Sequence, residues 1–349
     1  MKRWLLFLGV VGPLAIACRM FEISPLITFA FSAAALVPLG ALMEDATEEL
    51  AEYLGPTLGG LLNATLGNAP ELIIACMALS KGLEDVVKAS ITGSILGNLL
   101  FANGISMIAG GWNRKFQKFN HETAGLNSGL LYLAIVALVV PAMFGHTTPA
   151  EKGISLQVAV VLMAVYLVSL VYIISNRDPV IVAAEERHHD PKATPEEQPN
   201  VKRALVVLTA VTLGVALMSE ILTDAIGPTA TSLGLTTIFT GVFLLASAGN
   251  IAQTFNAVQF ARDDNLELTL STTVGSSTQI ALLVAPVLVF VSYAMGNPMD
   301  LVFSKLELFA LLVATGAIRN TTVDGVSNWM EGVLLVGVYA LLGIAFFAT

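Results

Sequence analysis

Glu71 is the one acidic residue of this sequence that we place deep inside an apolar stretch, because the other Asp and Glu residues fall in polar segments or near the ends of apolar ones. Asn68 precedes it by three residues, so both side chains would share one face of a helix. A charged side chain at the centre of a bilayer costs several kcal/mol and usually marks a functional site. We therefore interpret Glu71 as the metal-binding carboxylate, which would hold a cation when ionised and a proton otherwise.

Other oxygen-bearing side chains occur in apolar stretches of both halves of the chain. The candidate ligands besides Glu71 and Asn68 are Ser94, Asn98, Asn250, Gln253, Ser276 and Gln279. Asn256 continues the stripe that Asn250 and Gln253 begin, and none of the four histidines lies within the core of an apolar stretch. Oxygen ligands without sulfur or imidazole suit a hard cation such as Ca2+, Mg2+, Mn2+ or Na+ rather than zinc or copper.

These residues belong to an internal repeat. Gly67-Asn68 recurs as Gly249-Asn250, and Gly93-Ser94 recurs as Gly275-Ser276, in both cases 182 positions later. This common offset indicates a duplication. Inverted repeats of membrane transporters place the substrate near the midplane of the bilayer, where helices from the two halves are broken.

Helix breaks are predicted at the first motif of each half. Pro70 has no N–H and clashes with the carbonyl group of Leu66, so a kink is expected at Gly67-Asn68-Ala69-Pro70. The second half has no proline at this place and would bend through Gly249. In the alternative interpretation these glycines only allow close helix packing, although packing alone requires neither the adjacent asparagines nor a carboxylate.

The composition places the elements that carry these residues in a membrane. Hydrophobic side chains make up 55% of the 349 residues, charged ones make up 12%, and the mean hydropathy is +0.78. Soluble domains contain about 25% charged residues. A water-soluble enzyme, a nucleic-acid binder and a disordered scaffold are therefore excluded as main interpretations. The net charge of -9 favours cationic partners.

Apolar runs long enough to cross about 30 Å of hydrocarbon predict an all-α, polytopic membrane protein with about eleven transmembrane helices. The spans are expected near residues 4–19, 24–42, 57–80, 86–111, 125–145, 152–174, 203–222, 230–262, 266–293, 303–320 and 328–348. A cleaved signal peptide is the alternative for the first run, but ten further spans follow it. With a cytoplasmic N-terminus, 12 of the 17 Lys and Arg residues fall on the cytoplasmic side, so the positive-inside rule predicts this orientation.

The repeat and the spans together give the predicted organisation. Residues 1–22 form an extra first helix, residues 23–174 the first inverted repeat (spans 2–6), residues 175–202 an acidic cytoplasmic linker, and residues 203–349 the second inverted repeat (spans 7–11). Five helices in each repeat force the two copies into opposite membrane orientations.

Further acidic residues are expected at the two membrane surfaces. A cytoplasmic loop between spans 2 and 3 would be either simply solvated or a region that attracts cations. Its acidic residues are Glu44, Asp45, Glu48, Glu49 and Glu52. Glu220, close to the outer end of span 7, is interpreted as either a gate or a helix-end carboxylate that faces water.

The repeat motifs resemble those of the calcium/proton antiporters. Gly59–Leu72 (GGLLNATLGNAPEL) is similar to the first repeat signature of that family, and Gly93–Asn98 (GSILGN) to its continuation. Gly249–Asn250, Gly275–Leu282 (GSSTQIAL) and Asp324–Gly332 are similar to later parts, so the resemblance covers nearly the whole chain. It implies ten core helices with an extra first one, an acidic linker, and alternating access that exchanges cytosolic Ca2+ for protons.

One position departs from the family pattern. Members of the family use a glutamate in each repeat motif as the shared Ca2+ and proton site. The first maps onto Glu71, whereas the second position is Gln253, and the histidine that usually follows is Thr254. Glutamine offers an oxygen but does not titrate, and a single carboxylate leaves excess positive charge on a bound divalent ion. Three interpretations stay open: weaker Ca2+ transport with altered proton coupling, exchange of a monovalent cation (Na+ or K+), or a transport-impaired interaction protein.

We predict a secondary active cation antiporter, with Ca2+ and H+ as cargo and no cofactor. An enzyme is not expected, because no span pairs two catalytic carboxylates or a Ser with a Lys or His. The expected partners are inorganic cations and the lipid bilayer, without nucleic acid, and the sequence leaves open whether the chain forms a homo-oligomer. The short N-terminus favours a bacterial or archaeal plasma membrane as the location.

Overall fold

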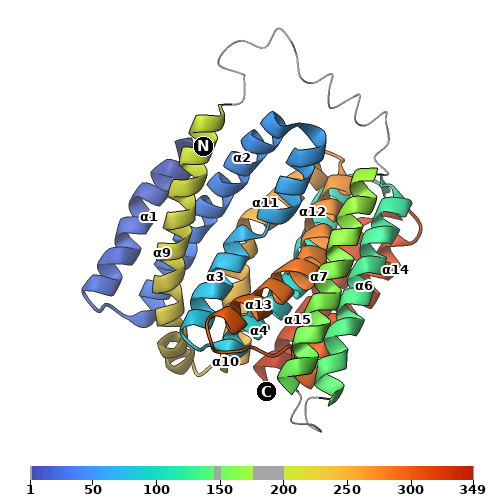
Figure 1. The fold of residues 1–349 in the computed structure, drawn as a ribbon. Helices are drawn as coiled ribbons and strands as arrows, with labels where there is room; N and C mark the ends of the chain where they lie inside the picture. Colours follow the sequence, from blue (N-terminus) through green and yellow to red (C-terminus); the bar gives the residue numbers. More distant parts are fainter. Residues whose placement is uncertain (1, 145–150, 176–199, 349) are drawn as a thin grey trace.

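The protein is a bundle of long helices, with the N-terminus at one end and the C-terminus at the other (Figure 1). The computed structural model describes residues 2–144, 151–175 and 200–348. The first helices are α1 (Lys2–Met20), α2 (Pro25–Leu66), α3 (Ala69–Ser80), α4 (Glu84–Leu96), η1 (Gly97–Ala102), α5 (Asn103–Gly111), α6 (His121–Phe144) and α7 (Glu151–Ser175). The others are α9 (Val201–Leu233), α10 (Thr237–Phe239), η2 (Thr240–Leu245), α11 (Ala246–Arg262), α12 (Leu266–Gln279), η3 (Ile280–Val284), α13 (Ala285–Ala294), α14 (Lys305–Thr322) and α15 (Trp329–Phe347).

The predicted all-α class is confirmed. In the described ranges the strands are limited to β1 (Gln117–Lys118) and β2 (Val326–Ser327), which pair in antiparallel orientation. This short ladder joins the segment before α6 to the segment before α15, and thereby ties the two halves of the chain together.

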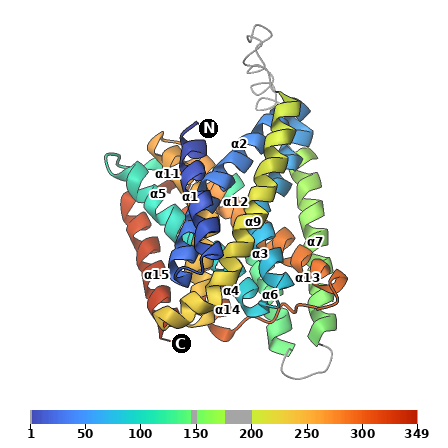
Figure 2. The same cartoon turned by 90° about the vertical axis from the view of Figure 1, so that its left-hand side faces the viewer.

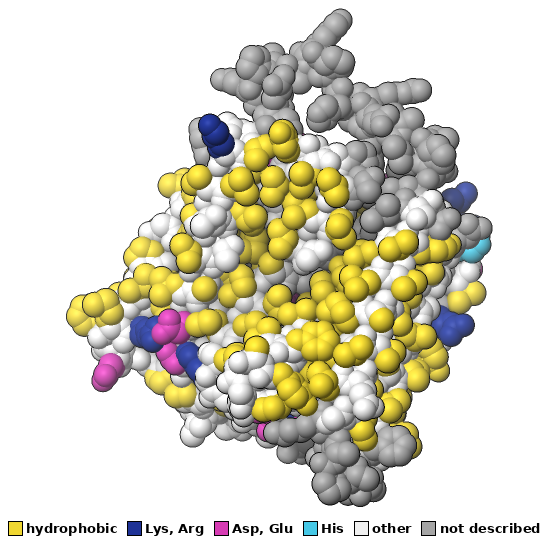
Figure 3. All heavy atoms as spheres, in the orientation of Figure 1, with side chains coloured by type: hydrophobic (Ala, Val, Ile, Leu, Met, Phe, Trp, Pro, Cys, Tyr) yellow, Lys and Arg dark blue, Asp and Glu magenta, His cyan; other side chains and the backbone are white. Residues whose placement is uncertain are grey.

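Eight helical segments of the described chain are long and apolar enough to cross a membrane. The other three predicted spans correspond to the shorter apolar helices α1 and α3 and to α14, which carries Lys305, Glu307 and Arg319 within its 18 residues. Large hydrophobic side chains are widely exposed. In Figure 3, hydrophobic side chains are spread over the visible face between the two ends of the bundle. A surface of this kind fits a lipid environment, so the chain is a multi-pass membrane protein.

The acidic segment 44–52, expected to be a loop between spans 2 and 3, is helical. It belongs to α2, in which two helical segments meet at a kink at Gly55, whose φ of 77° suits glycine. The prediction of a loop was wrong because charged residues were taken to end a span, whereas glutamate is a good helix former. The part of α2 before the kink, Pro25–Gly55, has 31 residues, so at about 1.5 Å per residue it is longer than the hydrocarbon layer, and its acidic end can extend beyond the layer.

One of the two predicted helix breaks is confirmed and the other is wrong. The helix ends at Leu66 and resumes at Ala69, with Pro70 in the first turn of α3. By contrast, α11 continues without interruption through Gly249. The second half instead contains π-helical turns, η2 just before α11 and η3 after α12, and η1 is a third such turn in the first half. The expected linker 175–202 lies almost entirely outside the described residues.

Two apolar clusters hold the helices together. One contains buried residues of α1, α2 and α9, which lie side by side along one flank of the molecule (Figures 1 and 2). The larger one joins α4 to α7 with α11 to α15. Helix α3 lies between them: Ile74 belongs to the first cluster and Ala75, Ala78 and Leu79 to the second. The helix that carries Glu71 is therefore packed against both parts of the protein.

Candidate cation site

The break before α3 brings the first repeat motif against α12. The Nδ2 of Asn68 donates to Oε1 of Gln279 at 2.6 Å, and Oγ of Ser276 donates to Oδ1 of Asn68 at 2.6 Å. The Nδ2 of Asn98 in turn donates to Oγ of Ser276 at 3.3 Å. Four predicted ligands from three distant segments thus form one chain of hydrogen bonds.

Glu71 lies in the first turn of α3, directly against α11. A Cβ atom at Gly249 would be 3.6 Å from Cγ and 3.7 Å from Oε1 of Glu71, so the two helices approach closely at this point. The Oε2 atom of Glu71 is buried and has no hydrogen-bond partner among the described residues. Gly249 therefore serves a close approach to the carboxylate, and not the helix break that the sequence predicted.

Asn250 and Gln253 lie on α11. The Nδ2 of Asn250 donates to the carbonyl oxygen of Ser94 at 3.4 Å, and Nε2 of Gln253 donates to that of Thr272 at 3.3 Å. Ser94 thus takes part through its main-chain oxygen. In both amides the nitrogen is satisfied, which leaves the oxygen available for another partner.

Four of the predicted ligands carry a buried oxygen without a donor in the described chain. These atoms are Oε2 of Glu71, Oδ1 of Asn98, Oδ1 of Asn250 and Oε1 of Gln253. An unpaired buried acceptor costs free energy, which a bound cation or a proton would recover. The described residues contain no group of three or more His, Cys, Asp or Glu side chains that could hold a metal ion. A cation here would depend on Glu71 and neutral oxygens, which is the chemistry of a hard cation.

Sequence reasoning missed Asn103, which is fully buried in the first turn of α5. Its Nδ2 donates to the carbonyl oxygens of Asn98 at 3.0 Å and Leu99 at 3.3 Å, inside the π-helical turn η1. Its Oδ1 accepts from Oγ1 of Thr273 at 2.7 Å. Asn103 therefore connects the turn that presents Asn98 to helix α12. The available signal was an amide side chain within an apolar stretch.

Glu44 was expected in a loop, but it lies on α2 beside α11. Its Oε2 accepts from Nδ2 of Asn256 at 2.8 Å, and Asn256 follows Gln253 by one helical turn. Four residues before Glu44, a Cβ atom at Gly40 would be 3.9 Å from the Cβ of Ala252. The two helices thus run alongside each other from Gly40 to Glu44.

Glu220 is not at a helix end, because α9 continues to Leu233. Its carboxylate pairs with Arg19 at 2.9 Å, and Arg19 also pairs with Asp224 at 2.9 Å. Lys81, which follows α3, pairs with Asp224 at 2.6 Å and donates to the carbonyl oxygen of Glu220 at 2.7 Å. These ion pairs join α1, α9 and the end of α3.

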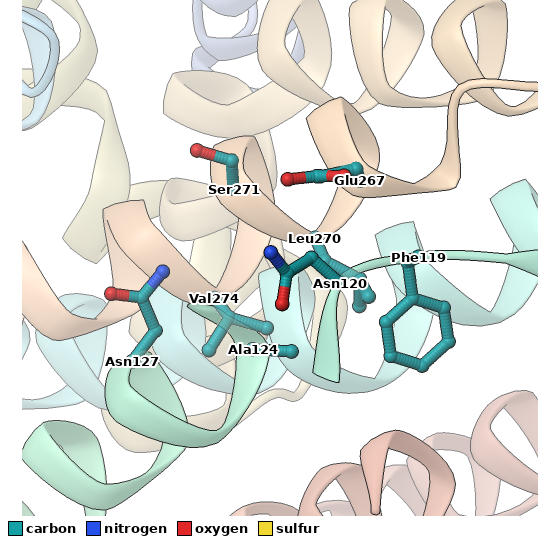
Figure 4. Close-up of a pocket in the computed structure, with 8 residues that line it drawn as sticks. All are labelled: Phe119, Asn120, Ala124, Asn127, Glu267, Leu270, Ser271 and Val274. Atoms are coloured by element: carbon teal, nitrogen blue, oxygen red, sulfur yellow. The ribbon is translucent and has the colours of Figure 1, made fainter. Parts of the chain in front are cut away.

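A small cavity lies between α6, α12 and the segment before α6 (Figure 4). Its volume is about 10 Å³, enough for about one water molecule. The polar side chains that line it are Asn120, Asn127, Glu267 and Ser271. None of the predicted ligands lines this cavity, so it is separate from the residues around Glu71.

Known proteins are similar to this chain over nearly its whole length. A profile of the family described as sodium/calcium exchanger protein matches residues 24–175 and 203–348. The Ca2+/H+ antiporter of Synechocystis sp. is 43% identical over 359 aligned positions, which cover 98% of this chain and 96% of that protein. The Ca2+/H+ antiporter ChaA of Bacillus subtilis is 37% identical and covers 99% of both chains. The solved structure of native YfkE has a TM-score of 0.84 at 34% identity, covering 99% of this chain and 100% of that one.

Proposed function

Because the chain belongs to the sodium/calcium exchanger protein family, we propose that it is a secondary active antiporter that exchanges Ca2+ for protons by alternating access. The observation that carries this proposal is the set of buried acceptors without donors on α3, η1 and α11, with Glu71 as the charged member. Relatives matched over nearly their full length are named Ca2+/H+ antiporters, which favours Ca2+ over Na+ or K+ as the cargo. These relatives are transporters, in keeping with the expectation that the chain is not an enzyme.

The mechanism follows from the two forms of Glu71. Ionised Glu71 attracts the cation, while the amide oxygens of Asn250, Gln253 and Asn98 replace part of its hydration shell. When the cation leaves, a proton on Glu71 removes the unpaired charge from the protein interior. The carboxylate thus holds either a cation or a proton, and this exclusivity couples the two movements.

The proposed architecture consists of two inverted repeats, residues 23–174 and 203–349, after an extra first helix. It is supported by the division of the family match into two segments, residues 24–175 and 203–348. The π-helical turns also follow the repeat. The turn η1 begins at Gly97, and the offset of 182 residues leads from Gly97 to Gln279, one position before the start of η3 at Ile280.

We also propose that the N-terminus is cytoplasmic and that the protein lies in the plasma membrane. Labelling of single cysteines introduced beside Lys2 and at the C-terminus, with a membrane-impermeant reagent on intact cells, tests the orientation.

The experiment that tests the function is ion flux in proteoliposomes that contain the purified full-length protein. Ca2+ uptake and internal pH are followed together under an imposed proton gradient, and Na+ and K+ are then substituted for Ca2+. Ca2+ uptake with opposite proton movement is the expected result. Proton movement with Na+ or K+ but not with Ca2+ would assign a monovalent cargo, and the absence of flux with all three ions would favour an interaction protein.

A further inference from the structure

The proposed site contains too little negative charge for its cargo. Glu71 contributes one carboxylate, the nearby amides of Asn250 and Gln253 are neutral, and the described residues contain no group of three or more His, Cys, Asp or Glu side chains arranged to hold a metal ion. A divalent ion bound by one carboxylate keeps an excess positive charge, which is costly away from water. A second carboxylate near the site would remove this excess.

Glu44 is the carboxylate whose position fits. Its hydrogen bond with Asn256 joins it to α11, one helical turn from Gln253, and the contact of Gly40 with Ala252 keeps α2 alongside this part of α11. Gly249, which approaches Glu71, and Asn256, which holds Glu44, are seven residues apart on α11, so both contacts lie on the same face of that helix, about 10 Å apart along its axis. Glu44 is an exposed residue, so the carboxylate is also accessible to hydrated ions.

We infer that Glu44 is a specificity-determining residue of the transport site, which supplies the second negative charge for a divalent cation beside Gln253. This inference rests on the proposed Ca2+ transport and extends the site to a residue outside the repeat motifs. Asn256 acts as the positioning residue, because its amide holds the Glu44 carboxylate on the side of α2 that faces α11.

The charge predicts a selective effect on divalent ions. A fixed negative charge interacts twice as strongly with a divalent ion as with a monovalent ion at the same distance, and more strongly near a protein than in bulk water. Glu44→Gln removes the charge but keeps an oxygen that can accept from Asn256. The Ca2+ affinity should fall about tenfold, which corresponds to about 1.4 kcal/mol.

The test combines Ca2+ binding with transport. Equilibrium dialysis with radioactive Ca2+ measures the affinity of the purified full-length protein, and proteoliposomes give KM for uptake. The control is Glu48→Gln, which removes the same charge one turn further along α2 and should change the Ca2+ affinity less than threefold. The double variant Glu44→Gln/Gln253→Glu restores a carboxylate one turn away on α11 and should recover most of the affinity.

Three results would overturn the inference. Equal losses in Glu44→Gln and Glu48→Gln would show a diffuse surface attraction, and so would a loss that disappears at about 1 M salt, where charges are screened within about 3 Å. Wild-type affinity in Glu44→Gln would show that the carboxylate is not used. If the wild-type protein transports Ca2+ in any of these cases, the proposed function stands and only the role of Glu44 is rejected. If the wild-type protein neither binds nor transports Ca2+, both the proposed function and the role of Glu44 are rejected.

Discussion

Oγ1 of Thr273 donates a hydrogen bond to Oδ1 of Asn103 at 2.7 Å, and this bond joins α12 to α5 inside the protein. The same asparagine side chain donates to the carbonyl oxygens of Asn98 and Leu99 in η1. In a π-helical turn the main-chain bonds are displaced by one residue, so extra donors of this kind stabilise it. Asn103 therefore stabilises the π-helical turn η1 and thereby helps to hold Asn98 in place.

Asn103→Leu should weaken both the fold and the site. Three buried hydrogen bonds are lost, each worth about 0.6 kcal/mol on average inside a membrane protein, so the free energy of unfolding should fall by about 2 kcal/mol. The Ca2+ affinity should fall as well, because Asn98 loses its support. Thermal unfolding in detergent and radioactive Ca2+ binding measure the two effects. Ser106→Ala is the control on the same helix, since Oγ of Ser106 is buried without a partner in the described chain and its removal should be harmless. Equal behaviour of the two variants would contradict this role for Asn103.

Glu71→Gln should abolish Ca2+/H+ exchange. The substitution keeps the size and one oxygen of the side chain but removes the charge and the ability to carry a proton. Ca2+ flux in proteoliposomes under a proton gradient should drop to the level of protein-free vesicles. The control is Glu22→Gln, which removes the same charge from an exposed turn between α1 and α2. Exchange that persists in the Glu71 variant would remove this residue from the mechanism.

Gln253→Glu should strengthen divalent binding in the otherwise natural protein. The new carboxylate would lie where Oε1 of Gln253 is now buried without a donor, and a bound Ca2+ ion would provide its counter-charge. We expect a Ca2+ affinity at least about tenfold higher, or about 1.4 kcal/mol, in equilibrium dialysis. Gln259→Glu makes the same change further along α11 and is the matched control. An unchanged affinity in the Gln253 variant would show that this position is not a ligand.

Gly93→Ala should destabilise the protein, whereas Gly275→Ala should not. A Cβ atom at Gly93 would overlap the main-chain carbonyl group of Val242 in η2, while nothing lies within 4 Å of a Cβ at Gly275. Overpacking of this kind costs about 1–3 kcal/mol, and alanine in place of an unhindered helical glycine gains about 1 kcal/mol. Thermal unfolding of the two variants in detergent measures the difference. Similar melting temperatures would mean that the helices separate at Gly93 without cost.

The membrane environment, the all-helical class and the candidate residues around Glu71 were predictable from the amino-acid sequence. Apolar runs are a strong signal because a bilayer interior forces the backbone into helices, and a polar residue inside such a run has few structural explanations. The helix break before Pro70 was predictable for a local reason, since proline cannot continue the hydrogen bonding of the preceding turn.

How these residues meet, and which further residues support them, depends on the packing of the helices. The approach of Gly249 to Glu71, the π-helical turns and the bonds of Asn103 depend on packing between helices far apart in the sequence. The placement of Glu44 on α2 and beside α11 also depends on it, because acidic residues suit a solvated loop and a helix equally well. The local sequence pattern therefore identifies residues that can bind a cation. The contacts between helices determine which of their oxygens are left without a hydrogen-bond donor and are available to a cation.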